Sequence, residues 1–439
     1  MTSVLYRSPA RDYPVAVSAQ GMYIRDAGGQ QYLDMSGGAA VSCLGHGHPR
    51  VVEVVQEQLA RLSYVHSAFF TTEPQEKLAQ RLARRFGDSD ALVYFGSGGS
   101  EVNETALKMC WQYWVARGKP DKKVVVSREH SYHGNTFGVL SVSGNAGRRR
   151  ASGAPLFDWP RISPCYSYRN RPADETTEQY ALRIAGELET VIQQTGADRV
   201  AAFICEPVVG SSLGVVAAEP AYLRRIRDIC DRHDILMIAD EVMCGSGRTG
   251  TYFACEHDAV QPDIATLGKG IGGGYQPLAA AVIGAKVART LYDAGFAHGH
   301  TYIGHASACA AGCAVQDVMD EEGLLERTRE AGKKFGALLS ERFGQHPLVG
   351  DIRGRGLFWG LELVSDRQSK RGFENGGGLP NRLLKAAMDA GMVCYPGGIT
   401  VDDAMVPHIL LAPPMLLEER HMLECMDCID QTISAVLHG

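Results

Sequence analysis

Between residues 90 and 285, short apolar runs alternate with segments of helical periodicity, and this alternation restricts the fold more than any other feature. Strands that alternate with helices in this way form a mostly parallel sheet covered by helices on both faces. We therefore expect an α/β fold. Strands are predicted at residues 91–95, 123–127, 200–206, 235–240, 264–267 and 279–283, and helices at residues 101–117, 180–195 and 219–233.

A chain of 439 residues is too long for one ordinary core. We expect a large domain over residues 51–310, a smaller α+β domain over residues 311–439, and an N-terminal segment, residues 1–50, that packs with the small domain. Residues 311–343 have the pattern of one long charged helix, and residues 351–363 alternate like a strand.

Residues 144–174 form a long stretch without regular periodicity, rich in glycine, proline and arginine. Loops of that length in a compact domain usually cover or serve a site. The stretch contains the most prominent basic cluster of the chain, Arg148-Arg149-Arg150, which we interpret as part of a solvated loop.

Composition and charge exclude several classes of partner. A formal net charge of −6 does not suit a nucleic-acid partner, which requires a basic face. The sequence has neither a run of 18 apolar residues nor a signal-peptide core, so we expect a cytoplasmic protein without a membrane partner. The 12 cysteines are scattered, as reduced thiols are, and Cys425 and Cys428 lack a second ligand pair, so no metal is predicted.

Ligands of open parallel sheets bind beyond the carboxyl ends of the strands. The first predicted strand runs into Gly96-Ser-Gly-Gly-Ser-Glu101 and then a helix, so Gly98, Gly99 and Ser100 predict a phosphate cradle at a helix N-terminus. Two nucleotide patterns do not fit. The P-loop needs Gly-Lys-Ser/Thr, whereas Gly270 follows Lys269, and Glu101 occupies the third glycine position of the dinucleotide fingerprint.

Four later strand ends present Tyr132, Glu206, Asp240 and Lys269. Individually these residues have ordinary interpretations, since carboxylates often cap helices and glycine-flanked lysines are often solvated. Together they offer an aromatic ring that can stack, carboxylates, and a lysine that can form an imine. An aldehyde cofactor such as pyridoxal 5'-phosphate requires this combination.

The motifs that contain these residues resemble those of class III aminotransferases, which are fold-type I pyridoxal-phosphate enzymes related to ω-amino acid and amine transaminases. The resemblance spans nearly the whole chain. Its main motifs are Leu44-Gly-His-Gly-His-Pro49, Gly99-Ser-Glu-Val-Asn-Glu104, Tyr132-His-Gly134, Glu206-Pro207, Asp240-Glu-Val242, Leu267-Gly-Lys269 and Arg353-Gly-Arg-Gly356.

This resemblance implies how the cofactor ring is bound. Lys269 forms the Schiff base with pyridoxal 5'-phosphate and, once released, moves the proton between substrate and cofactor. Asp240 pairs with the pyridine nitrogen and keeps it protonated. Val242 lies against one face of the ring and Tyr132 against the other.

The resemblance also implies how the phosphate is bound and how the subunits associate. Gly99 and Ser100 hold the phosphate, and Thr301 of a neighbouring subunit completes its site in a homodimer, with a tetramer left open. Glu206 orients a polar group near the cofactor or gates the binding of a substrate carboxylate.

The implied reaction transfers an amino group from an amine or ω-amino acid to a keto acid, pyruvate or 2-oxoglutarate, in two half-reactions. A racemase or aminomutase on the same fold, and a non-catalytic cofactor-binding protein, remain alternatives. Many relatives bind the substrate carboxylate with an arginine shortly before the final Pro-Pro pair. Here no Lys or Arg lies between Lys385 and Arg420, so Arg353 or Arg355 has to serve, or the acceptor is bound in another way.

Overall fold

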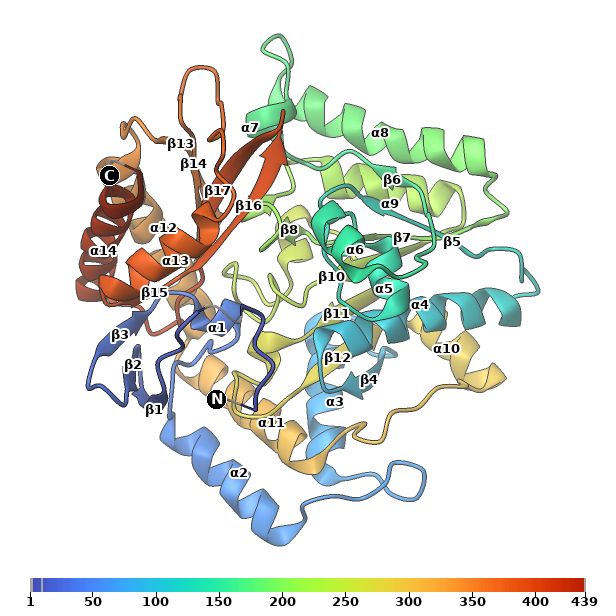
Figure 1. Ribbon diagram of the computed structural model, residues 1–439. Helices are drawn as coiled ribbons and strands as arrows, with labels where there is room; N and C mark the ends of the chain where they lie inside the picture. Colours follow the sequence, from blue (N-terminus) through green and yellow to red (C-terminus); the bar gives the residue numbers. More distant parts are fainter. Residues whose placement is uncertain (1–2, 9–10, 438–439) are drawn as a thin grey trace.

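The computed structural model describes residues 3–8 and 11–437, and a seven-stranded sheet forms its centre (Figure 1). In spatial order the strands are β4 (Leu92–Gly96), β12 (Ala279–Ile283), β11 (Ile264–Leu267), β10 (Leu236–Asp240), β7 (Val200–Cys205), β5 (Val124–Arg128) and β6 (Arg161–Ile162). Strands β11, β10, β7, β5 and β6 run parallel, whereas β12 is antiparallel to both of its neighbours. The expected α/β fold and its six predicted strands are confirmed, each to within one residue.

Helices cover both faces of this sheet because its central strands are apolar along their whole length. Every residue of β7, β10 and β11 is buried. Phe203 packs with the helices of one face and its neighbour Ile204 with those of the other, as the alternation of side chains in a strand requires. The covering helices are α8 (Thr177–Thr195) and α9 (Tyr222–Arg232) on one face, and α4 (Gly99–Ala116) and α10 (Ala285–Ala294) on the other.

The N-terminal and C-terminal parts of the chain share a second sheet, in which Leu33 pairs with Met392. Its order is β1 (Ala16–Gln20), β2 (Tyr23–Asp26), β3 (Gln31–Asp34) and β15 (Met392–Val393). A third sheet has the order β13 (Val349–Arg355), β14 (Phe358–Leu363), β17 (Ala404–Leu411) and β16 (Tyr395–Val401). One apolar core joins these sheets to α12 (Leu324–Phe343), α13 (Leu379–Asp389) and α14 (Glu419–Leu437).

Two predictions for the C-terminal half are wrong, each because of a glycine. The expected single helix over residues 311–343 is two helices, α11 (Ala306–Glu321) and α12, separated at Gly323, whose φ of +61° ends the first helix. The expected single strand over residues 351–363 is a hairpin of β13 and β14. Its turn contains Gly356 at φ +59°, where a Cβ would lie 2.8 Å from the carbonyl oxygen of Arg248.

The stretch of residues 144–174 is more regular than the sequence suggests, since it contains the helices α6 (Ala146–Ser152) and α7 (Ser167–Asn170) as well as β6. Asn145 caps α6, because its side chain accepts a hydrogen bond from the backbone N–H of Arg148 at 3.0 Å, and Gly153 ends the helix at φ +61°. The interpretation of residues 148–150 as a solvated loop is therefore wrong, with consequences for the site.

The remaining elements connect these layers. Helix α11 packs against α2 (Pro49–Arg61) and α3 (Glu73–Phe86). The shorter elements are α1 (Gly37–Ala40), α5 (Phe137–Val142), β8 (Val208–Val209), β9 (Val216–Ala217), η1 (Ala254–Asp258) and η2 (Lys269–Ile271). Over residues 3–8 and 11–437, no helix has both the length and the apolar character needed to cross a membrane.

Candidate active site

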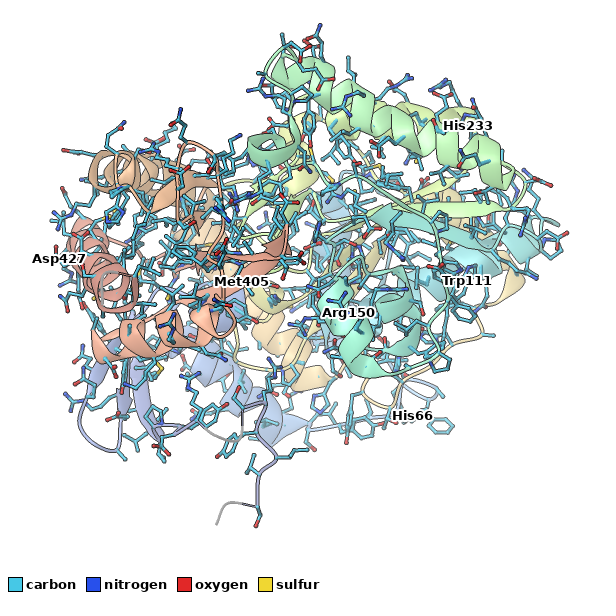
Figure 2. The ribbon with its side chains drawn as sticks, turned by 45° about the horizontal axis from the view of Figure 1, so that its top comes forward. His66, Trp111, Arg150, His233, Met405 and Asp427 are labelled. Carbon is cyan, nitrogen blue, oxygen red and sulfur yellow. The ribbon has the colours of Figure 1, made fainter. Side chains whose placement is uncertain are left out.

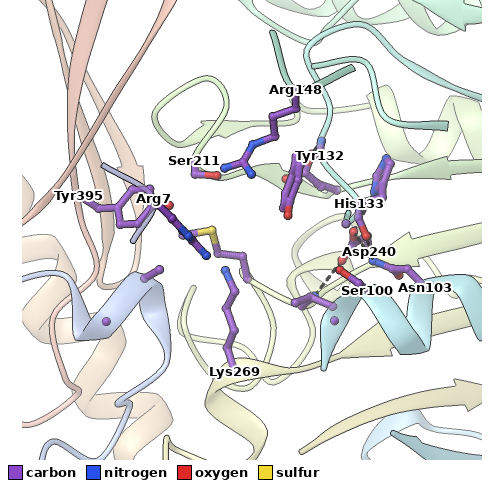
Figure 3. Close-up of a pocket in the computed structure, with 17 residues that line it drawn as sticks. Arg7, Ser100, Asn103, Tyr132, His133, Arg148, Ser211, Asp240, Lys269 and Tyr395 are labelled. Carbon is purple, nitrogen blue, oxygen red and sulfur yellow. Dashed lines mark hydrogen bonds and ion pairs between the residues drawn. The ribbon is translucent and has the colours of Figure 1, made fainter. Parts of the chain in front are cut away.

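A cavity of about 350 Å³ lies at the carboxyl ends of the central strands, and it collects most of the predicted site residues (Figure 3). Of the nine predicted residues, seven line it: Gly99, Ser100, Tyr132, Glu206, Asp240, Val242 and Lys269. Two do not line it. Gly98 is the residue that precedes α4, and Thr301 is exposed in a turn, where its carbonyl accepts a hydrogen bond from the Tyr64 hydroxyl at 2.9 Å.

Lys269 follows β11, from which it is separated by Gly268 alone. The side chain of Lys269 extends into the cavity (Figure 3). Its backbone has the left-handed φ of +48°, an uncommon conformation for a residue with a side chain. The glycines beside it allow close packing, since a Cβ at Gly268 would lie 3.1 Å from Val242 and one at Gly270 3.1 Å from Ser246. Burial lowers the pKa of the Lys269 amine, which increases the neutral, nucleophilic fraction.

Asp240 ends β10 and is only 4% exposed. One of its oxygens contacts His133 Nδ1 at 2.8 Å and accepts a hydrogen bond from Asn103 Nδ2 at 2.8 Å. The other oxygen accepts from the backbone N–H of Val242 at 3.1 Å. Three groups from three segments therefore fix the carboxylate in one orientation.

Asn103 connects this carboxylate to the sheet. Its amide oxygen accepts a hydrogen bond from the Thr266 hydroxyl at 2.6 Å, and its amide nitrogen also donates to the carbonyl of His133 at 2.8 Å. Because both side-chain atoms of Asn103 have defined partners, its orientation is fixed by the network.

Glu206 joins two loops of the cavity wall. Its carboxylate accepts hydrogen bonds from the backbone N–H of Tyr132 at 3.0 Å and of Gly210 at 3.2 Å, and its own carbonyl accepts one from Arg128. Burial raises the pKa of the Glu206 carboxyl group, with the charge of Asp240 acting in the same direction.

Small residues close the end of the cavity formed by α4. A Cβ at Gly99 would lie 2.7 Å from Val242, and one at Gly134 would lie 2.6 Å from the Ser100 hydroxyl. That hydroxyl accepts a hydrogen bond from the backbone N–H of Asn135 at 3.1 Å. The first turn of α4 adds backbone N–H groups without intrahelical partners and a positive dipole end, so this corner suits a phosphate.

The sequence reasoning missed several cavity residues. Asn103, His133 and Gly134 lie inside quoted motifs without having been given a role, and Met243 directly follows one, whereas the others come from separate parts of the chain. The missed residues that line the cavity are Arg7, Gly38, Asn103, His133, Gly134, Arg148, Ser211, Met243 and Tyr395; Ala39 lines it as well. The capping signal of α6, Asn145 followed by Gly153, is the one local pattern that could have identified Arg148 as ordered.

Neither arginine expected to bind the substrate carboxylate lines the cavity. Arg353 is buried, donates to the carbonyls of Leu213 and Gly214, and pairs with Asp351 and Glu362 at 2.8 Å. The expectation that Arg353 serves a substrate is therefore not supported by its contacts. Among the residues that the structure describes, no group of three or more His, Cys, Asp or Glu side chains is placed to hold a metal ion.

Comparison with known proteins agrees with this geometry. The family model of class III aminotransferases matches residues 7–433. An uncharacterized aminotransferase of Schizosaccharomyces pombe is 39% identical over 437 residues, which cover 99% of this chain and 95% of that protein. A γ-aminobutyrate transaminase of Solanum lycopersicum is 33% identical over 410 residues, covering 92% and 77% of the two chains.

Solved structures of ω-transaminases are also similar to this chain in fold and in sequence. The (S)-enantioselective ω-transaminase of Thermomicrobium roseum superimposes with a TM-score of 0.91 at 33% identity, covering 99% of this chain and 96% of that one. The ω-transaminase of Pseudomonas jessenii in complex with PMP gives a TM-score of 0.92 at 31% identity, covering 99% and 97%.

The chain therefore belongs to the class III aminotransferase family. It is a transaminase that uses pyridoxal 5'-phosphate, and its fold is that of the fold-type I enzymes of this class. Nothing in the comparisons favours a racemase or aminomutase.

Proposed function

We propose that the protein transfers an amino group from an amine or ω-amino acid to a keto acid, pyruvate or 2-oxoglutarate, with Lys269 as the catalytic residue. The observation that carries the proposal is a lysine amine of lowered pKa in the same cavity as the firmly oriented carboxylate of Asp240. The ω-transaminases and γ-aminobutyrate transaminases among the similar proteins support this substrate class.

The residues of the cavity fit pyridoxal 5'-phosphate. Gly99 and Ser100 offer backbone N–H groups and a hydroxyl to the phosphate, and Gly98 shapes the turn before them. Tyr132 and Val242 supply apolar surface for the two faces of a flat ring. When bound, the cofactor withdraws electrons from the substrate carbon that carries the amine, and this makes the proton on that carbon acidic.

The protein's own groups perform the remaining tasks. Asp240 would pair with the ring nitrogen of the bound cofactor, because His133, Asn103 and the backbone N–H of Val242 fix the orientation of its carboxylate. The neutral Lys269 amine takes a proton from the substrate carbon and returns it at a different position. We assign Glu206 an indirect role, since it fixes the loop that carries Tyr132.

We also propose a homodimer, possibly paired further into a tetramer, in which Thr301 completes the phosphate site of the neighbouring subunit. Exposed aromatic side chains near this turn support the idea: Phe69 is 78% exposed, Phe70 66% and Tyr302 59%. Light scattering should give the mass of at least two chains. Thr301→Ala should weaken binding of the cofactor phosphate without changing that mass.

Two further parts of the proposal concern the whole chain. We retain the division into residues 1–50, 51–310 and 311–439 as the domain proposal, supported by the sheet that residues of both ends share. We also propose a cytoplasmic location, supported by 12 cysteines that are all free. Cell fractionation tests the location.

The assignment of Lys269 is tested by chemistry at one residue. Purified protein loaded with pyridoxal 5'-phosphate should absorb as a protonated imine does, and borohydride should fix the cofactor to the peptide that contains Lys269. Lys269→Ala should abolish amino transfer from amine to pyruvate or 2-oxoglutarate, whereas Lys385→Ala, at an exposed lysine of α13, should leave it intact. Cofactor fixed to another peptide, or turnover retained by Lys269→Ala, would refute the assignment.

A further inference from the structure

Two arginines from distant parts of the chain line the cavity (Figure 3). Arg7 belongs to the N-terminal segment, and Arg148 belongs to α6. In Figure 3 the guanidinium of Arg148 lies between Ser211 and Tyr132, and Arg7 lies beside Tyr395. These five residues line the same cavity as Lys269.

In the part of the chain that the structure describes, no carboxylate is paired with either of these two cations. Within residues 3–8 and 11–437, no ion pair joins Arg7 or Arg148 to an Asp or Glu side chain. The two carboxylates of the cavity have other partners. Asp240 accepts hydrogen bonds from Asn103 and from the backbone N–H of Val242. Glu206 accepts hydrogen bonds from two backbone N–H groups. Both guanidinium groups are therefore available to an anionic ligand in the cavity.

Arg148 is preorganised for a planar anion. Its guanidinium carbon lies 4.5 Å from the centre of the Tyr132 ring, a cation–π contact that holds the side chain in the cavity and uses none of its N–H groups. The side chain is half-buried, which limits the loss of entropy on binding. Guanidinium N–H groups along one edge match the two oxygens of a carboxylate.

The segment that carries Arg7 is anchored to the C-terminal part of the chain. The rings of Tyr6 and Tyr13 stack with their centres 4.5 Å apart, and Arg11 donates to the sulfur of Met388 in α13 at 2.8 Å. The Arg11 contact ties this part of the chain to α13, and Arg7 itself is exposed. Arg7 thus adds positive charge at the entrance, whereas Arg148 supplies the oriented contact.

Other cationic side chains are excluded as alternatives. The guanidinium of Arg353 is already hydrogen-bonded to a backbone carbonyl and paired with Glu362. Arg355 lies near Asp258 and does not line the cavity. In α6, Arg149 donates to the backbone carbonyls of Leu140, Ser141 and Ser143. Arg150 is exposed on the surface (Figure 2). Arg148 is the member of its cluster that reaches the cavity.

We propose that Arg148, assisted by the charge of Arg7, binds the carboxylate of the substrate at the end remote from the reacting carbon. This inference rests on the proposed amino transfer and specifies its substrate class: ω-amino acids as donors and, as acceptors, keto acids with a second carboxylate remote from the carbonyl carbon, such as 2-oxoglutarate. Donor and acceptor occupy the same cavity in turn, so either carboxylate, or both, can use the site.

The kinetic test compares substrates that differ in one charge. Arg148→Gln should raise the KM for 4-aminobutanoate about 10- to 100-fold, and that for n-butylamine by less than about threefold, because a charge-assisted contact is lost only with the anion. The same comparison of 2-oxoglutarate with 2-oxopentanoate, which lacks only the carboxylate remote from the carbonyl carbon, tests the acceptor. Arg150→Gln, on the next residue of the same helix, should change neither value. A change confined to the donor pair or to the acceptor pair identifies whose carboxylate is bound.

A binding test separates this inference from the proposed function. Cofactor-loaded protein is titrated calorimetrically with glutarate, which has neither an amine nor a carbonyl carbon that can react, and with its uncharged diamide. Glutarate should bind at least about tenfold more weakly to Arg148→Gln than to the wild type or Arg150→Gln, with Arg148→Lys intermediate because lysine lacks the planar fork. Arg7→Gln should give a smaller loss.

The outcomes differ for the two ideas. Equal glutarate affinity in Arg148→Gln and Arg150→Gln, equal KM increases for charged and uncharged substrates, or a loss of cofactor affinity in Arg148→Gln would each overturn the carboxylate site. Wild-type protein that binds glutarate through Arg148 but transfers no amino group from any donor would support the site and refute the proposed function.

Discussion

The hydrogen-bond network around Asn103 gives the most quantitative prediction. Asn103 is 1% exposed and makes three short side-chain hydrogen bonds, to Thr266, Asp240 and the carbonyl of His133. Asn103→Leu keeps a similar volume but leaves these three buried polar groups with one partner fewer. At about 1 to 2 kcal/mol for each group, the free energy of unfolding should fall by about 3 to 6 kcal/mol.

Thr266→Val isolates one of these bonds. The substitution keeps the shape of the side chain and removes the hydroxyl that donates to Asn103 at 2.6 Å, so it should cost about 1 to 2 kcal/mol. In the Asn103→Leu background the same hydroxyl is already unpaired, and its removal should cost nothing or stabilise the protein. The coupling energy of the double-mutant cycle should therefore be about 1 to 2 kcal/mol.

The assay is denaturant unfolding of the cofactor-free protein for wild type, both single variants and the double variant. Asn381→Leu serves as the control, because Asn381 is exposed on α13 and should change stability little. Cofactor affinity provides a second measurement, and it should fall more in Asn103→Leu than in Thr266→Val, since only the former removes a donor to Asp240. Additive effects of the two substitutions would refute the network as described.

Two further predictions concern backbone strain and pH. Ala39→Gly should stabilise the protein by about 0.5 to 1 kcal/mol, because Ala39 has the left-handed φ of +77°. Ala40→Gly, at φ +64°, should leave the stability nearly unchanged, because it also removes a buried methyl group. Thermal unfolding of the two variants measures the difference. Burial lowers the pKa of His408 from 6.5 to about 4, so below pH 7 the unfolded chain binds a proton at this residue and the folded protein does not. The free energy of unfolding should therefore fall by about 2 kcal/mol between pH 7 and pH 5. His408→Gln should lose less stability over that range, and an unchanged pH dependence would contradict the assignment.

The parts of the fold that could be predicted are those where burial determines the pattern. Strands such as β7 and β10 are apolar at every position because helices cover both faces, so their ends, and with them Asp240 and Lys269, could be located from the sequence. The hairpin of β2 and β3 in the second sheet could be predicted in the same way, since residues 21–34 form two short runs around Gly28 and Gly29. In each case one local signal agrees with the tertiary structure.

The parts that could not be predicted depend on tertiary contacts or on unusual backbone. Helix α1 combines Gly37, Gly38, Ala39 and Ala40, all at positive φ, although alanine strongly favours the right-handed region. Nothing in the local sequence indicates that two alanines adopt this conformation. The local sequence does not predict the role of Asn103 either, because that role depends on Thr266 and Asp240, which are distant in sequence.

Arg148 lies between these cases, and it shows why cofactor chemistry is easier to predict than substrate choice. The cofactor residues lie at strand ends, whose position is set by the apolar core, whereas Arg148 lies on a helix of seven residues within a polar stretch. The family resemblance leads one to expect a carboxylate-binding arginine near β16, where this chain has Tyr395. If the cation acts from α6 instead, the substrate carboxylate lies near Tyr132, against a different wall of the cavity. Enzymes that share Lys269 and Asp240 can therefore select different substrates through residues that lie outside the cofactor motifs.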